Sequence, residues 1–187
     1  DSACRELARS QQNLKFTLED IAVTAKLPID VVMENSKNSR GFASVTTIIE
    51  RVFIAQEKQV SNIFVVYLAN STSMDDVENG IVECVRQLCF LTRNDPVAKV
   101  FWTDAFNNGH LHTLGLEVSN QRGQIFIDRL SELAPHWDPH RLKMMVTVMV
   151  QSIYQTAKVV QNLPEKQALA LIAEAERIAV MGFRDTY

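Results

Sequence analysis

Apolar residues recur at helical spacing along almost the whole chain of 187 residues. The clearest stripe lies in residues 40–70, where Val45, Ile48, Ile49 and Val52 follow the i, i+3, i+4, i+7 pattern of one helix face. No Asn-Gly turn joins two segments of alternating polarity, and only five prolines and six glycines interrupt the chain. The pattern predicts an all-α fold.

Start and stop signals divide this pattern into helices. Thr17 and Asp20 are spaced as a capping box, and an Asp-Pro pair at 95–96 and at 138–139 places a cap before a proline in the first turn. Glycines at both ends of 109–115 predict a loop there. The predicted helices cover about 3–12, ten residues after Thr17, 29–36, 40–70, 75–94, a short segment from 96, 117–134, 138–162 and a last segment from 164.

The last two predicted helices have more apolar surface than a helix buried on one side requires. Helix 138–162 has an inner stripe that includes Leu142 and Met149, but also Met144 and Val148 outside it, and Leu171 lies beside the stripe of the last helix. Such a pair at the chain end predicts a four-helix dimer interface, with two helices from each subunit. The alternative is that both helices are central in a monomer. The predicted interface residues are Met144, Val148, Leu171 and Ala175.

Composition is that of a folded protein without a membrane span. Hydrophobic residues make up 47% of the chain, and the longest strictly apolar run is the seven residues 63–69, far short of the roughly 20 needed to cross a bilayer. The first residues lack the pattern of a signal peptide, so we expect a cytoplasmic protein. Cys84 and Cys89 fit a helix core, and Cys4 is expected to be exposed.

The segment Thr17–Leu27 and the order of the helices resemble the TetR family of transcriptional regulators. In that family a threonine, an acidic residue and Ile-Ala lead into the turn of a helix-turn-helix. The resemblance implies a three-helix DNA-binding domain over residues 1–55 and a ligand-binding and dimerisation domain over 56–187. It also implies a homodimer, operator DNA and a small-molecule effector as partners. The family's turn glycine falls at Lys26, where a left-handed backbone costs about 1 kcal/mol more than at glycine.

The resemblance assigns DNA contacts to both ends of the helix-turn-helix. The residues are Thr17, Asn35, Lys37, Ser39 and Arg40, with Asn35 reading an adenine edge and the others contacting the backbone. Against this, the net charge is −3 and the reading helix contains Asp30 and Glu34, which repel phosphates. A helix-turn-helix scaffold with weak or lost DNA binding is therefore the competing interpretation.

The resemblance also implies a pocket between the helices of the second domain. Bulky or soft side chains on inner stripes favour a small apolar or aromatic ligand, and no charge is obviously stranded among them. The alternative is that each of these side chains belongs to the ordinary core. The candidate ligand-binding residues are Phe64, Tyr67, Leu88, Phe101, Trp102, Phe106, Phe126, Met145 and Met149.

Catalytic and metal-binding motifs are missing from the sequence. It has no Gly-x-Ser-x-Gly, no glycine-rich phosphate loop and no His-Glu-x-x-His. The four histidines have no carboxylate or cysteine at a recognised metal-ligand spacing. We therefore predict no enzyme, no metal and no cofactor. The predicted function is a ligand-controlled repressor, and the alternative is a dimeric helical ligand-binding protein with weak or lost DNA binding.

Overall fold

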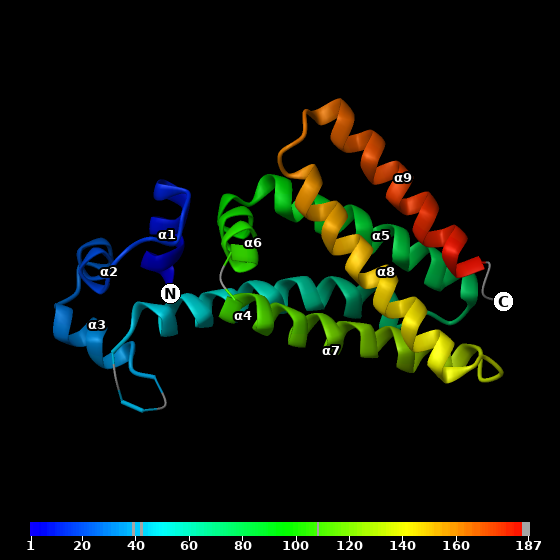
Figure 1. The fold of residues 1–187 in the computed structure, drawn as a ribbon, viewed down its shortest axis with the longest axis horizontal. Helices are drawn as coiled ribbons and strands as arrows, with labels where there is room; N and C mark the ends of the chain where they lie inside the picture. Colours follow the sequence, from blue (N-terminus) through cyan, green and yellow to red (C-terminus); the bar gives the residue numbers. More distant parts are fainter. Residues whose placement is uncertain (39, 42, 108, 185–187) are drawn as a thin grey trace. The chain divides into compact units, whose positions relative to one another are not determined.

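The structure, a computed structural model, describes residues 1–184 except 39, 42 and 108, and gives the backbone alone for 104–107. Its elements are helices, with one isolated bridge between Lys37 and Ala43 in the described ranges (Figure 1), so the predicted all-α fold is confirmed. The elements are α1 (Ser2–Gln11), α2 (Leu18–Ala25), α3 (Ile29–Asn35), α4 (Val45–Phe64), the π-helix η1 (Val65–Ala69), α5 (Met74–Asn94), α6 (Pro96–Asn107), α7 (Gly109–Leu133), α8 (Pro139–Val160) and α9 (Glu165–Arg184). None of the described helices is both long and apolar enough to span a bilayer.

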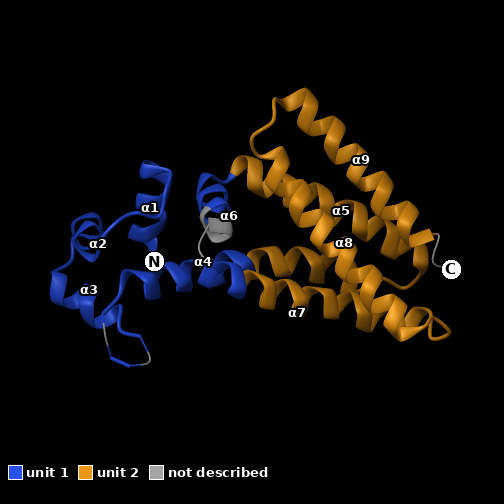
Figure 2. Ribbon diagram, viewed as in Figure 1, with its two compact units in different colours: residues 1–57, 95–114 blue, residues 58–94, 115–187 orange. Residues whose placement is uncertain are grey.

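The chain divides into two compact units (Figure 2). Unit 1 contains residues 1–57 and 95–114, and unit 2 contains 58–94 and 115–187. The division differs from the predicted boundary at 55/56 because α6 and the start of α7 belong with the N-terminal helices. Their apolar residues Val97, Phe101 and Leu111 are buried in the core of unit 1.

The core of unit 1 includes one face of α1. Ala3, Cys4, Leu7 and Ala8 are buried on that face. The expectation that Cys4 is exposed was therefore wrong, because the first helix is folded onto the unit. Burial raises the pKa of the Cys4 thiol to about 11, so it stays protonated at neutral pH.

Local signals in the helix-turn-helix segment act as the sequence predicted. The Thr17 hydroxyl accepts from the Asp20 amide at 3.2 Å, and the Asp20 carboxylate accepts from the Thr17 amide at 2.8 Å. Lys26 ends α2 in the left-handed conformation, with φ of 54°. Val32 of α3 is buried in the core of unit 1.

In unit 2, α5 is held against α8 and α9 by buried apolar residues and by polar bonds at several levels. The buried Thr92 hydroxyl lies 3.1 Å from the Ala157 carbonyl oxygen on α8. Arg93 donates to the Val160 carbonyl at 2.6 Å, near the end of α8. Arg184 of α9 pairs with the buried Glu78 of α5 at 2.8 Å. The three helices are therefore fixed along their length, and the predicted core positions Cys84 and Cys89 are buried among them.

The predicted helix 40–70 begins later and ends differently. It starts at Val45, and its last turn is the π-helix η1. Gly80 of α5 lies against this turn, since a Cβ at Gly80 would be 2.3 Å from the Tyr67 carbonyl oxygen. The absence of a side chain at Gly80 is what allows α5 to approach the η1 backbone so closely.

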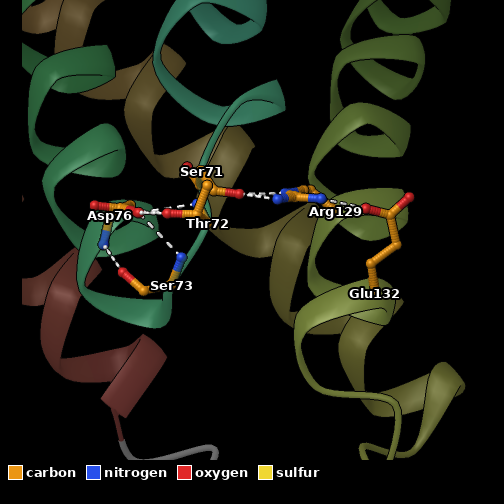
Figure 3. A network of polar contacts seen from close by, with 6 residues as sticks. All are labelled: Ser71, Thr72, Ser73, Asp76, Arg129 and Glu132. Carbon is orange, nitrogen blue, oxygen red and sulfur yellow. Dashed lines mark hydrogen bonds and ion pairs between the residues drawn. The ribbon is translucent and has the colours of Figure 1, made fainter.

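The N-terminus of α5 is tied down by a polar network (Figure 3). Asp76 accepts from the amides of Thr72 and Ser73 at 2.9 and 3.0 Å, and the Ser73 hydroxyl accepts from the Asp76 amide at 3.1 Å. Arg129 of α7 donates to the Ser71 carbonyl oxygen. The Ser73 hydroxyl thus satisfies the Asp76 amide in the first turn of α5, the Asp76 carboxylate satisfies the two amides just before the helix, and Arg129 fixes this start to α7.

The predicted loop over 109–115 is helical, which corrects the sequence-based interpretation. α7 begins at Gly109, and Leu111 is buried in unit 1. His110 contacts Glu50 of α4, with 2.9 Å between Nε2 and Oε1. Glycine weakens a helix by only about 1 kcal/mol, and packing of Leu111 offsets that cost. His110 and His112 are therefore helical residues and not loop residues.

Candidate functional sites

A long apolar groove lies between α8 and α9 in unit 2, with a volume of about 570 Å³. All four residues predicted for a dimer interface line it: Met144 and Val148 from α8, and Leu171 and Ala175 from α9. Met144 and Val148 are 53% and 62% exposed in the single chain. The structure thus brings the predicted interface residues together on one surface.

The hydroxyls and the carboxylate at this groove are satisfied within the chain, and Arg141 brings an exposed guanidinium to it. The Ser152 hydroxyl donates to the Val148 carbonyl at 2.8 Å, and the Thr156 hydroxyl donates to the Ser152 carbonyl at 2.9 Å. Glu174 accepts from Arg177, and these hydrogen bonds lower the pKa of its carboxyl. Covering the groove with apolar side chains would therefore leave few polar groups without a hydrogen bond.

The residues predicted to touch DNA lie in unit 1, at both ends of the helix-turn-helix. The Thr17 hydroxyl belongs to the capping box, and the Asn35 amide donates to the Val31 carbonyl at 2.8 Å. Lys37 forms an ion pair with Glu34. Arg40 is exposed, and Ser39 lies outside the described residues. Three of the five predicted residues thus already have local partners in the single chain.

Four of the five exposed side chains of α3 are acidic or apolar, and the fifth is Asn35. Asp30 and Glu34 are exposed, and so are Val31 and Met33. Carboxylates repel phosphates, and valine and methionine have no donor for a phosphate oxygen or a base edge. The segment consists of two short helices joined by a turn that starts at the left-handed Lys26, but most of the exposed side chains of α3 are not those that bind nucleic acid strongly.

The predicted ligand-binding residues are divided among three environments. In unit 2, Phe64 and Phe126 pack edge to face with ring centroids 6.3 Å apart, Leu88 is buried and Tyr67 is half-buried. Phe101 and Trp102 are buried in unit 1, and the side chain of Phe106 lies outside the described residues. Met145 and Met149 line the α8–α9 groove. Core packing accounts for Phe64 and Phe126, and no described cavity unites the set.

Sequence reasoning missed a buried cation. Arg122 of α7 is fully buried; its Nε donates to the Ser61 hydroxyl at 2.9 Å, and its guanidinium lies 5.3 Å from the centre of the Tyr154 ring. The sequence analysis did not predict this buried charge. The sequence gives no signal for this burial, because arginine in an otherwise polar stretch of helix normally faces solvent.

Comparison with known proteins finds a similar fold but no matching family. No protein-family model matches the chain, and no curated protein sequence matches it. The chain is similar in fold to a solved structure, the proposed transcriptional regulator SCO7518 from Streptomyces coelicolor A3(2). The two share 13% identity with a TM-score of 0.66, over 95% of this chain and 94% of the other. The architecture is thus shared from the N-terminal helices to the last helix pair.

Proposed function

We propose that this protein is a transcriptional regulator of TetR-like architecture, acting as a homodimer and contacting operator DNA through unit 1. The observation that supports it most is the fold likeness to a proposed regulator along nearly the full length of both chains. A likeness confined to the last helices would point only to a dimerisation module. The likeness to SCO7518 also includes the N-terminal helices.

Dimerisation through the α8–α9 groove is the first part of the proposal. The two helices have 22 and 20 residues, so each offers a surface about 30 Å long. Met144, Val148 and Ile178 are each more than half exposed along this surface. A second copy related by a twofold axis would bury these side chains against the same residues of its partner, as in other isologous interfaces.

DNA contact through unit 1 is the second part. Arg40 and Lys37 supply positive charge just after α3, the Thr17 hydroxyl lies at the start of α2, and Asn35 is exposed at the end of α3. Asp30 and Glu34 oppose phosphate binding, so affinity is expected to be modest and strongly dependent on salt. A dimer partly offsets this weakness, because two linked reading units bind one operator with higher avidity than either alone.

Retention of random genomic duplexes at low salt, followed by a salt titration, tests the proposal. We expect retention that falls as salt rises, and a slope reduced by about 1 in Lys37→Ala or Arg40→Ala if each residue binds one phosphate. Lys166→Ala is the matched control, since Lys166 is an exposed lysine at the start of α9. Failure of the dimer to retain DNA at low salt would overturn the regulator proposal.

A dimeric helical ligand-binding protein without DNA recognition is the second candidate. It is favoured by the exposed Val31 and Met33 and by the ion pair that engages Lys37 with Glu34. Glu34→Gln separates the two candidates, because it removes a negative charge and releases Lys37. A regulator should then retain DNA more strongly, whereas a dimer that retains none before or after the substitution fits the second candidate.

A further inference from the structure

A second groove in unit 2 differs in chemistry from the apolar one. It lies between α7 and α8 and has a volume of about 240 Å³. Hydroxyl, amide and ammonium groups from both helices line it. These polar residues are Ser119, Asn120 and Gln124 from α7, and Lys143, Thr147 and Gln151 from α8.

One cation lines the described part of this groove, and one carboxylate, that of Asp128, lies beside it. Lys143 is the one charged side chain among the described lining residues, and no carboxylate is among them. Asn120, Gln124 and Gln151 provide amides that can both donate and accept hydrogen bonds, although the Gln124 amide already donates to the Asp128 carboxylate at 2.6 Å. A neutral polar lining with one ammonium group suits a ligand that has several hydroxyls and a single negative group.

The two walls of the groove are joined by a hydrogen bond, and one lining position, Gly123, has no side chain. Gln151 of α8 donates to the buried Ser119 hydroxyl of α7 at 3.2 Å, which joins the two helices beside the groove. Gly123 of α7 lines the same space without a side chain, and a Cβ there would meet only Val146, at 3.7 Å. A larger side chain at Gly123 would therefore extend into the groove.

Size limits the ligand further. Sites for drug-sized ligands usually measure about 300–1,000 Å³, so a groove of this volume fits a smaller metabolite. Ile127 and Val150 add apolar surface to the lining, which suits the carbon skeleton of a sugar-like molecule.

We propose that the α7–α8 groove binds a small polyhydroxylated anion, of the sugar-acid or sugar-phosphate class. Lys143 pairs with the anionic group, and the amides and hydroxyls bind the ligand's hydroxyls. The claim that this ligand is the effector of a regulator rests on the proposed function. The claim that the ligand binds in the groove does not. The proposal replaces the apolar ligand expected from the sequence, since Phe64 and Phe126 are engaged in core packing.

Calorimetric titration of the full chain without DNA tests the site, with gluconate and glucose 6-phosphate as probes. Sorbitol controls for hydroxyls without charge, and hexanoate controls for charge without hydroxyls. We expect at least one anionic probe to bind about tenfold or more tightly than either control, because a charge-assisted hydrogen bond has roughly that effect. Lys143→Met should weaken this binding about tenfold, while Lys166→Met, an equal loss of charge on α9, should leave it unchanged.

Gly123→Leu supplies an independent test, because its side chain would fill the groove without removing charge. Loss of binding, with an unfolding temperature close to that of the unsubstituted protein, supports the site. If this variant does not fold, the Lys143→Met result decides. Binding of neither anionic probe, equal binding of sorbitol, or binding unaffected by Lys143→Met would overturn the proposal.

The DNA-retention experiment separates this result from the proposed function. Anion binding without DNA retention would support the groove and overturn the regulator. DNA retention without anion binding would do the reverse. If both hold, the anionic probe should change DNA retention in the unsubstituted protein and not in Lys143→Met.

Discussion

Both units expose large apolar side chains, but they do so in different ways. In unit 1, Val23, Val31 and Met33 are exposed on helices of eight and seven residues, with Asp30 and Glu34 on the same short α3. In unit 2, the exposed Met144, Val148 and Ile178 of α8 and α9 line one groove whose serine and threonine hydroxyls are bonded to their own helix. The difference indicates that exposed apolar residues form a candidate interface where long helices align them and nearby polar groups are satisfied.

The two units also cap their helices differently. Thr17 and Asp20 form a simple capping box at α2. At α5, Asp76 accepts from the hydroxyl of Thr72 at 2.7 Å in addition to the amides of Thr72 and Ser73, and Arg129 holds the preceding carbonyl of Ser71. The start of α5 is therefore connected to a distant helix of unit 2, whereas the cap of α2 is local.

The largest expected effect concerns the α8–α9 groove. Val148→Asp would bury an unpaired charge in the proposed dimer, so its dissociation constant should rise by at least about 100-fold and leave monomers. Val66→Asp is the matched control, because Val66 is 61% exposed and Val148 is 62% exposed, but Val66 lies on η1. Light scattering measures both. Dimers that persist in Val148→Asp, or are lost equally in both variants, would contradict the groove as the interface.

The next effect concerns the tight packing within unit 2. In Gly80→Ala the added methyl would lie 2.3 Å from the Tyr67 carbonyl oxygen, so the free energy of unfolding should fall by about 1–3 kcal/mol. Gly123→Ala is the control, because its methyl has room and alanine favours a helix; it should raise the free energy of unfolding by about 0.5–1 kcal/mol. Denaturant titration compares them. Equal stability of the two variants would contradict this prediction and would mean that the η1 backbone shifts to make room for the added methyl group.

A smaller effect is expected from the cap in unit 1. Thr17→Ala removes the hydroxyl that accepts from the Asp20 amide, and should lower the free energy of unfolding by about 1 kcal/mol. Thr46→Ala, at an exposed position in the first turn of α4, should change it by less. If the two variants are equally stable, the capping box contributes little to unit 1.

The smallest effect is a pH dependence at the cap in unit 2. Hydrogen bonds from Thr72 and Ser73 lower the pKa of Asp76 below its usual 3.8. The charged carboxylate therefore stabilises the fold above pH 3.8, and this contribution is lost as pH falls through the lowered pKa. Asp76→Asn should be less stable than the unsubstituted protein at neutral pH, and the difference should shrink in acid. A difference that does not change with pH, measured by urea titration, would contradict this.

Much of the fold could be predicted from local signals. The apolar periodicity predicts the helices, the Thr17–Asp20 spacing predicts the cap, and the family's turn predicts the left-handed Lys26. The excess of apolar residues at Met144 and Val148 predicts the surface that lines the α8–α9 groove. Each signal depends on residues within a few positions of one another, and the backbone geometry of a helix converts such spacing directly into a shared face.

The sites could be predicted only in part. The ion pair of Glu34 with Lys37 was not predicted, because Lys37 lies beyond the end of α3 and was assigned to DNA contact. The polar groove between α7 and α8 was not predicted either, because it forms from two helices whose register no local signal fixes. For the same reason, the sequence could not show that the predicted ligand-binding residues lie in separate parts of the structure.

The sequence by itself determined where most of the helices lie, the caps at Thr17, Asp95 and Asp138, and the two apolar sides of the last pair. Tertiary structure alone decided the helical start of α7, the burial of Cys4 and Arg122, and the membership of residues 95–114 in unit 1. Helix formation and capping depend on bonds between near neighbours, so the order of residues specifies them. Burial depends on which distant segments pack together, and sequences with the same helical pattern can pack their helices in different ways.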